Sequence, residues 1–275
     1  MENLLAIVWD VDPEAFRIPF IDWPVRWYGI LFVIGLLVSQ YIMFYIFEKE
    51  GKTRKHVEDL TIYVVVGTII GARLGHVIFY DFMDYLKNPI DILKVWEGGL
   101  ASHGGAIGIL IAIYLFCRKY KFNYLWLLDR IVIVVCFTGA CIRTGNLMNS
   151  EIIGTVTDVP WAFQFLRAYP PELRLDARHP AQLYEAIYCL LLMGLLWYLW
   201  SKKREKLNNG FIFGVFLVIL WTLRFIDEFF KVNQVAFEDN MEFNMGQLLS
   251  IPFIIAGFYL IWRARSKPLE TDPSQ

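Results

Sequence analysis

The sequence lacks an excess of charge of either sign. It carries 26 Lys and Arg against 27 Asp and Glu, for a formal net charge of -1. A nucleic-acid-binding domain usually carries a basic patch, and no zinc-finger or RNA-binding motif is found, so we expect no nucleic-acid partner. There is also no internal repeat, glycine-rich phosphate loop or dinucleotide fingerprint, which argues against ATP-driven and nicotinamide chemistry.

The sequence has few cysteines and lacks the features of a secretory signal peptide. The four cysteines lie in or beside apolar stretches without a CxxC pair, and we interpret them as apolar packing residues. The first sixteen residues have neither the basic region nor the small-residue cleavage site of a secretory signal, so we expect no processing.

Apolar residues dominate what is present. They make up 57% of the chain, aromatic residues make up 17%, and the mean hydropathy is +0.45. A helix of about 20 residues crosses the hydrocarbon core of a bilayer. We therefore predict an all-α, polytopic membrane protein with seven transmembrane helices. The predicted spans are 27–47, 60–80, 100–117, 130–148, 180–200, 210–230 and 247–263.

The distribution of Lys and Arg predicts the orientation, because cytoplasmic loops retain positive charge. Segments 48–59, 117–130, 201–209 and 263–275 hold fifteen of these residues, whereas the alternate segments hold eight. The C-terminus is therefore predicted to be cytoplasmic and the N-terminus to lie on the outer face. We expect one membrane-embedded domain over 1–275, an outer arm near 81–99, a small outer head near 149–179 and a disordered tail near 264–275.

Three arginines lie inside predicted helices: Arg73, Arg143 and Arg224. Placing a guanidinium in hydrocarbon costs at least about 2.5–3.5 kcal/mol, so such residues normally face a polar cavity or an anionic partner. All three lie in the outer half of their helices, which favours one shared anion site. The alternative is that each forms a structural ion pair, for instance Arg224 with Asp227 or Glu228.

Glycines recur at four-residue spacing in two neighbouring predicted helices. Gly67, Gly71 and Gly75 form a double GxxxG ridge, and Gly104 and Gly108 repeat the spacing in the next helix. This pattern predicts close backbone contact between the two helices. We assign it no catalytic role.

His103 lies between glycines in WEGGLASHGGAIG, where a helix is predicted to re-enter the membrane from outside. Histidine suits proton transfer near neutral pH. The glycines allow a ligand to approach the backbone closely, and the first free N–H groups of the helix can receive an anion.

A polar stripe marks the outer end of the fourth predicted helix. Arg143, Asn146 and Asn149 are spaced by three and fall near one helix face, and Glu151 follows. A cation, two amides and a carboxylate at headgroup level suit a phosphate and glycerol hydroxyls. A simple polar helix end is a plausible alternative for Asn149.

Further polar residues lie near the outer ends of other predicted helices. Gln182 and Glu185 are three residues apart at the start of the fifth helix and should face the same direction. Arg224 is followed one turn later by Glu228. Tyr28 lies at the outer interface, where aromatic residues are common without a specific function.

Four motifs occur together in the order HGGAIG at 103–108, RTGNLMNSEIIG at 143–154, HPAQLYE at 179–185 and RFIDEFF at 224–230. This set resembles the signature of the prolipoprotein diacylglyceryl transferase family. The resemblance implies a bacterial inner-membrane transferase with its active site toward the periplasm. It implies phosphatidylglycerol as lipid donor and the lipobox cysteine of a preprolipoprotein signal peptide as acceptor. The implied products are a thioether-linked protein and glycerol 1-phosphate, and no metal or cofactor is implied.

Carried onto matching positions, the resemblance makes Arg143 and Arg224 essential lipid-phosphate contacts and His103 the proposed base. One departure is that Leu220 and Trp221 stand where the family pattern has a Tyr-Gly pair, which puts any hydroxyl role there in doubt. The residues predicted to bind substrate are Tyr28, Arg73, Arg143, Asn146, Asn149, Glu151, Gly154, Gln182, Glu185 and Glu228.

Two other functions fit a helical membrane protein with buried arginines. The first is a seven-helix transporter of an anionic solute, which discontinuous helices and repeat symmetry would favour; neither is evident in the sequence. The second is a different membrane transferase that acts on phospholipid headgroups, which the identity of the modified acceptor distinguishes.

Overall fold

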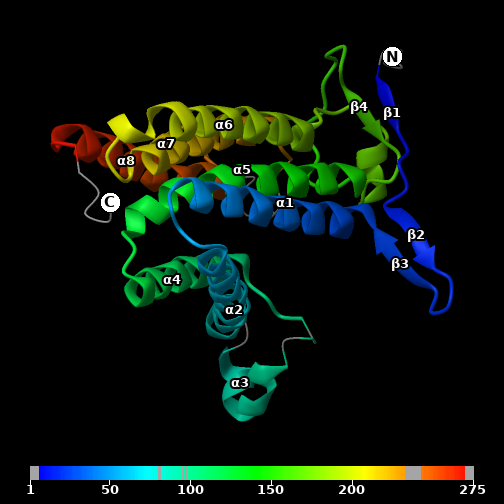
Figure 1. Ribbon diagram of the computed structural model, residues 1–275. Helices are drawn as coiled ribbons and strands as arrows, with labels where there is room; N and C mark the ends of the chain where they lie inside the picture. The colour runs from blue at the N-terminus through cyan, green and yellow to red at the C-terminus, as the bar shows by residue number, and fades with distance from the viewer. Residues whose placement is uncertain (1–5, 80–81, 95, 97, 233–242, 270–275) are drawn as a thin grey trace. The chain divides into compact units, whose positions relative to one another are not determined.

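The computed structural model in Figure 1 describes residues 6–79, 82–94, 96, 98–232 and 243–269, which are mostly helical. The chain divides into two compact units, residues 42–127 and the remainder, and each is described by itself. The α-helices are α1 (Trp27–Lys49), α2 (Arg54–Phe79), α3 (Phe82–Lys87), α4 (Ser102–Tyr120), α5 (Tyr124–Met148), α6 (Ala181–Lys203), α7 (Phe211–Asp227) and α8 (Met245–Ser266). Short 3-10 helices are η1 (Pro89–Leu93), η3 (Pro171–Arg174), η4 (Arg204–Lys206) and η5 (Glu228–Phe230).

Five helices in the described ranges are long and apolar enough to cross a membrane: α1, α2, α5, α6 extended through η4, and α8. The remaining two predicted spans coincide with α4 and α7, which have 19 and 17 residues. At about 1.5 Å per residue, α7 alone rises about 26 Å, slightly less than a hydrocarbon core of about 30 Å. A polytopic, mainly helical protein is confirmed, and the number of seven spans stays a prediction.

Within residues 42–127, glycines bring α2 and α4 together. A Cβ on Gly67 would lie 2.6 Å from the Ala112 Cβ, and a Cβ on Gly71 would lie 2.7 Å from the Gly108 Cα. The two backbones are therefore in direct contact, which confirms the packing predicted from the glycine spacing. At the far end of α4, the Tyr120 hydroxyl donates to Asp59 at 2.6 Å.

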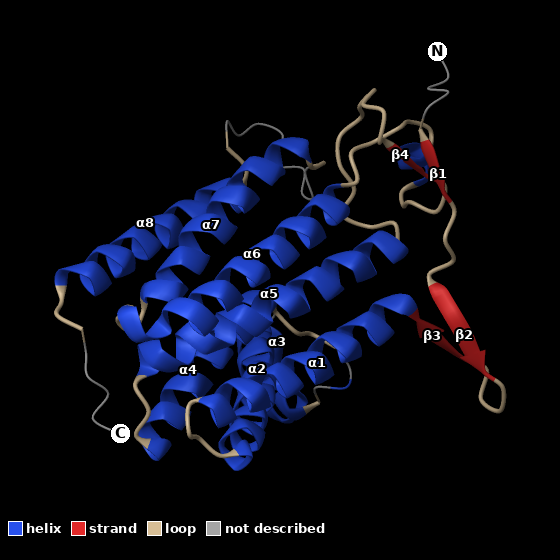
Figure 2. Ribbon diagram, turned by 45° about the horizontal axis from the view of Figure 1, so that its top comes forward, coloured by secondary structure: helices blue, strands red, loops and turns tan. Residues whose placement is uncertain are grey.

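In the other unit, the first part of α1 and the helices α5 to α8 lie side by side (Figures 1 and 2). Ser39 on α1 contacts the Thr138 hydroxyl on α5 at 2.8 Å. Gly214 and Gly257 allow α7 and α8 to approach closely, since a Cβ on Gly214 would lie 2.9 Å from the Gly257 carbonyl oxygen. The Asp129 carboxylate accepts the Gly210 and Phe213 N–H groups and so completes the first turn of α7.

Two small sheets occur that the all-α prediction missed. β1 (Ile7–Trp9) pairs in parallel with β4 (Phe163–Phe165), and β2 (Glu14–Ile18) pairs antiparallel with β3 (Trp23–Arg26). The strands are three to five residues long. Strands this short carry little alternation, and the pairing of β1 with β4 joins segments more than 150 residues apart.

The segment between α5 and α6 contributes to a small hydrophobic core near the end of α5. Its buried members are Leu147, Ile153, Phe163, Phe165 and Ala168, and Trp9, Leu173 and Leu183 pack against them. The Trp9 indole N–H donates to the Leu147 carbonyl at 3.0 Å, which ties the N-terminal strand to the end of α5. The side of the membrane on which this segment lies stays a prediction.

The predicted tail and the predicted arm are described only in part. Helix α8 continues to Ser266, past the start of the tail predicted at 264. Asn208 donates to the carbonyls of Ala264, Lys267 and Pro268, which holds the first residues after the helix. The rest of the predicted tail, 270–275, lies outside the described residues, as do 80–81, 95 and 97 of the predicted arm.

Candidate functional site

Six charged side chains from α5, α6, α7, η5 and the residue after η5 meet at one end of the helices, within a single unit. We call this group the charged cluster. Its members are Arg143, Glu185, Arg224, Asp227, Glu228 and Lys231. Three cations and three carboxylates balance one another, which allows the group to be buried in a largely apolar protein.

Glu185 contacts both Arg143 and Lys231 and so links these two cations of the charged cluster. One of its carboxylate oxygens lies 2.5 Å from the Arg143 Nε, and the other lies 2.5 Å from the Lys231 Nζ. The side chains of Glu185 and Lys231 are each only 4% exposed. An ion pair with so little access to water is weakly screened, so removal of one partner leaves an expensive buried charge.

The analysis of the sequence did not identify Lys231. Its Nζ also lies 3.1 Å from Asp227 and 3.2 Å from Glu228, so one ammonium contacts three carboxylates. The spacing of three and four residues from Glu228 and Asp227 was the available signal. Lys231 follows η5, so helical geometry does not set the direction of its side chain. That direction depends on the backbone of the segment around Gly154, which pairs with Lys231.

That pairing segment contains Gly154. Thr155 N–H donates to the Phe230 carbonyl at 2.8 Å, and Gly154 N–H donates to the His179 carbonyl at 2.9 Å. A Cβ on Gly154 would lie 2.5 Å from the His179 carbonyl oxygen and 2.6 Å from that of Phe230. Gly154 is therefore needed for close backbone packing beside Lys231, which gives a physical reason for its predicted supporting role.

Arg224 occupies the other end of the charged cluster. Its Nη2 lies 3.5 Å from Glu228, as the ion-pair alternative predicted, and its guanidinium lies 5.8 Å from the centre of the Trp221 ring. Trp221 in turn stacks on Phe253 with ring centroids 4.3 Å apart. The departure from the family pattern at Trp221 thus supplies an aromatic face for Arg224.

Glu228 is also fixed from α8. The Asn244 side-chain amide donates to Glu228 at 3.1 Å, and Asn244 begins α8 through a capping box with Gln247. A Cβ on Gly246 would lie 2.6 Å from the Glu228 carboxyl carbon. The start of α8 therefore positions the carboxylate that pairs with Arg224.

The predicted polar stripe on α5 is a connected chain of hydrogen bonds. Arg143 Nη1 donates to Asn146 at 3.2 Å, and the amides of Asn146 and Asn149 both donate to one oxygen of Glu151, at 2.9 and 3.1 Å. Buried Gln182 donates to the Glu151 carbonyl at 2.5 Å. The structure therefore brings Arg143, the two asparagines, Glu151, Gln182 and Glu185 together.

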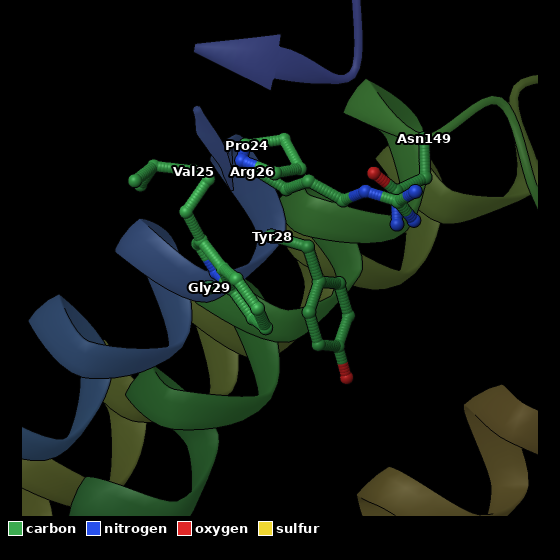
Figure 3. Close-up of a pocket in the computed structure, with 7 residues that line it drawn as sticks. Pro24, Val25, Arg26, Tyr28, Gly29 and Asn149 are labelled. Atoms are coloured by element: carbon green, nitrogen blue, oxygen red, sulfur yellow. The ribbon is translucent and has the colours of Figure 1, made fainter. Parts of the chain in front are cut away.

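A shallow hollow of about 420 Å³ lies beside this stripe, at the junction of β3, α1 and the end of α5. Its lining includes Arg26, Tyr28, Gly29 and Asn149. Figure 3 shows the Arg26 side chain extended toward Asn149, with the Tyr28 hydroxyl pointing away from both. Tyr28 packs on Gly145, where a Cβ would lie 2.8 Å from the tyrosine ring.

The two arginines of the charged cluster keep N–H groups that the protein does not use. The contacts of Arg143 with Glu185 and Asn146 run through Nε and Nη1, and the closest contact of Arg224 with Glu228 runs through Nη2. A guanidinium has five N–H groups, so donors remain for a ligand. Arg224 has a side chain that is one-third exposed. Guanidinium groups held in position by carboxylates, with donors still free, are suited to binding phosphate oxygens.

Arg73 and His103 belong to the unit formed by residues 42–127. The buried Arg73 guanidinium donates to backbone carbonyls of the segment that links α2 to α4: Ile92 at 2.9 Å, Gly98 at 2.7 Å, Gly99 at 3.3 Å, and Asp91. His103 is exposed in the first turn of α4. The structure thus gives Arg73 a role in holding this segment, and its role as a substrate contact stays a prediction.

Comparison with known proteins matches the chain to one family. The family model described as prolipoprotein diacylglyceryl transferase covers residues 13–263. A protein of Porphyromonas gingivalis named phosphatidylglycerol–prolipoprotein diacylglyceryl transferase is 44% identical over 275 residues, which cover 96% of each chain. Proteins of the same name from Tolumonas auensis (44% identity; 93% of this chain and 96% of the relative) and Rickettsia typhi (37%; 94% and 98%) are also similar. With a matching family model over most of its length and relatives at this identity, the chain belongs to the prolipoprotein diacylglyceryl transferase family.

Proposed function

We propose that this membrane protein transfers the diacylglyceryl group of phosphatidylglycerol to the thiol of a lipobox cysteine in a prolipoprotein. The observation that carries the proposal is the charged cluster, in which carboxylates fix Arg143 and Arg224 while some of their N–H groups remain free. The names of the relatives support the choice of donor and acceptor. No observation favours a transporter.

The proposed chemistry is a single displacement at carbon. The cysteine thiol loses its proton to a base, and the sulfur then attacks the carbon of the diacylglyceryl group that bears the phosphate oxygen. A carbon–sulfur bond forms as the carbon–oxygen bond breaks, and the electron pair leaves with glycerol 1-phosphate. Negative charge grows on the phosphate during this step, and guanidinium groups fixed beforehand stabilise it.

The remaining predicted residues have supporting roles in the proposal. Asn146, Asn149 and Glu151 offer amides and a carboxylate to the glycerol hydroxyls, next to the phosphate contact at Arg143. Tyr28 lines the adjoining hollow. Gln182 and Glu185 hold Glu151 and Arg143 in place rather than contacting lipid, since both side chains are buried.

His103 is the proposed base. A free thiol has a pKa of about 8.5, so only a few per cent is thiolate near neutral pH and a base accelerates the reaction. His103 is accessible, and no hydrogen bond within the described chain occupies its ring. We expect His103→Gln to lower the rate near neutral pH and a higher pH to restore part of it; the same fractional loss at every pH would contradict this role.

We further propose seven membrane crossings, with α4 and α7 as the two additional spans. Support comes from their close glycine contacts with the spanning helices α2 and α8. With the N-terminus outside, the excess of Lys and Arg lies on the cytoplasmic side and the charged cluster faces the periplasm. The protein is then placed in the bacterial inner membrane, where the lipid and the precursor meet.

The decisive assay combines purified protein, labelled phosphatidylglycerol and a lipobox peptide, with and without its cysteine. Label transfer should require the cysteine, and glycerol 1-phosphate should appear in equal amount. Arg143→Ala should lower the rate by about 10²–10³, the usual effect of removing one preorganised donor. Arg143→Lys should also be impaired, and Arg118→Ala, at an exposed position on α4, should not. Near wild-type turnover by Arg143→Ala would refute the phosphate contact.

A further inference from the structure

The β2–β3 hairpin has one apolar face and one charged face. The strand register pairs Ile18 with Trp23 and Phe16 with Val25, which places these four side chains on the same side. The turn between the strands adds Phe20 and Ile21. Such a hairpin carries more apolar surface than a small element in water normally exposes.

Most of the large apolar side chains of this hairpin are exposed, namely Phe16, Phe20, Ile21 and Trp23, whereas Ile18 and Val25 are half-buried. Phe20 is 97% exposed, Ile21 67% and Trp23 65%. They do not belong to a membrane-spanning helix, so contact between lipid tails and a transmembrane segment does not account for them. Another surface must cover them if they are to leave water.

The charged side chains of the hairpin pair among themselves on the opposite face. Arg17 lies 2.9 Å from Glu14 and 3.1 Å from Asp22. The register is irregular between Glu14 and Phe16, which allows Glu14 to share the side of Arg17. One face of the hairpin therefore carries paired charges, and the other carries aromatic and aliphatic groups.

The position of the hairpin follows from its connection to α1. β3 ends at Arg26 and α1 begins at Trp27, so no linker separates the hairpin from a spanning helix. The 23 residues of α1 rise about 34 Å, enough to cross the core of about 30 Å and bring Trp27 to the interface. In Figures 1 and 2 the hairpin projects past this end of α1, clear of α5 to α8.

We propose that the hairpin is a lipid anchor whose apolar face lies in the headgroup region of the bilayer leaflet next to the start of α1. Aromatic side chains favour this interface, and an amphipathic element can lie in it with its charged face toward water. The hollow is lined by β3 itself, Trp23–Arg26, together with Tyr28, Gly29 and Asn149. The anchor therefore holds this hollow at the level of lipid headgroups. It depends only on membrane embedding and is independent of the proposed chemistry.

The first test measures the depth of the hairpin directly. Phe20→Cys is labelled with a nitroxide in bilayer discs that contain phosphatidylglycerol, and Tyr169→Cys, 84% exposed in the head, is the matched control. The four native cysteines are buried, and unsubstituted protein measures their background labelling. The label at Phe20 should collide several-fold less with a water-soluble nickel chelate, and more with oxygen, than the label at Tyr169. Equal accessibility at both positions would overturn the anchor.

A peptide partner is the main competing occupant, and the same samples separate it from lipid. If the label at Phe20 is exposed in the discs and becomes shielded only when a lipobox peptide is added, the surface binds the precursor and the lipid anchor is wrong. Shielding without peptide, unchanged when it is added, supports the anchor.

A second pair of variants tests the apolar side chains themselves. Phe20→Ser combined with Ile21→Ser should increase trypsin cleavage after Arg17 several-fold in bilayer discs. The matched change in the head, Tyr169→Ser combined with Leu175→Ser, should not. All four side chains are exposed, and equal thermal stability in detergent verifies that both variants fold. A folded hairpin variant that is cleaved no faster than wild type would contradict the proposal.

Discussion

Replacing Lys231 by methionine is the sharpest test of the charged cluster. The substitution keeps the length of the side chain and removes the single ammonium that contacts Glu185, Asp227 and Glu228, at 2.5, 3.1 and 3.2 Å. Glu185 and Glu228 would still have Arg143 and Arg224 as ion partners. Asp227 would lose its ion pair while its side chain stays 5% exposed.

The expected cost follows from this geometry. Breaking a buried ion pair by removing one partner usually destabilises a protein by about 3–5 kcal/mol, because the other charge stays buried. At about 2–4 °C per kcal/mol, the apparent Tm should fall by about 6–20 °C. The double variant Lys231→Met with Asp227→Leu restores the charge balance of the cluster. It should recover a large part of the lost stability.

The Tm is measured by thermal unfolding in detergent for wild type, both single variants and the double variant. These four values form a double-mutant cycle. The coupling between Lys231 and Asp227 should be large, as for residues in direct contact. Additive effects of the two substitutions, or a Lys231→Met variant as stable as wild type, would refute the reasoning. Transferase activity measured in parallel shows whether displacement of Glu185 reaches Arg143.

Three further predictions test local features of the structure. Gly154→Ala should lower stability by about 1–3 kcal/mol, measured as a fall in Tm, and reduce activity, because its Cβ would overlap the carbonyls of His179 and Phe230. Gly71→Ala should weaken the packing of α2 on α4 and lower the Tm, whereas Gly194→Ala, with nothing within 4 Å, should not. Burial lowers the pKa of His179, so the folded state binds fewer protons than the unfolded chain and stability should fall as pH drops below about 6.5. His179→Gln should remove that part of the pH dependence of the Tm, and an unchanged pH profile would contradict the assignment.

The local parts of the candidate site were predictable from spacing. The three-residue interval from Arg143 to Asn146 and Asn149 predicted a shared helix face, and hydrogen bonds through Glu151 now connect these residues. The interval from Gln182 to Glu185 predicted a shared direction, and both side chains are buried. Helical periodicity fixes such neighbours within one or two turns, whatever the rest of the fold does.

The contacts between site residues that lie far apart in the chain were not predictable from the sequence. Lys231 lies outside the regular helix, and its contact with Glu185 depends on backbone pairing between the segments at Gly154 and Phe230. The expectation that Arg73 joins the other two arginines rested on similar depth in the membrane. Its donors bind the carbonyls of the segment after α2, a partner that helical spacing does not reveal.

Taken alone, the sequence determined the membrane class, the main helices, the contact of the glycine ridges and the family, because each depends on composition, periodicity or an ordered set of motifs. Tertiary structure decided which carboxylate faces each arginine, where the short strands pair and how Lys231 enters the charged cluster. Those features are contacts between residues far apart in the chain. Their energies depend on burial and on distances of a few ångströms, which residue types and spacing do not contain.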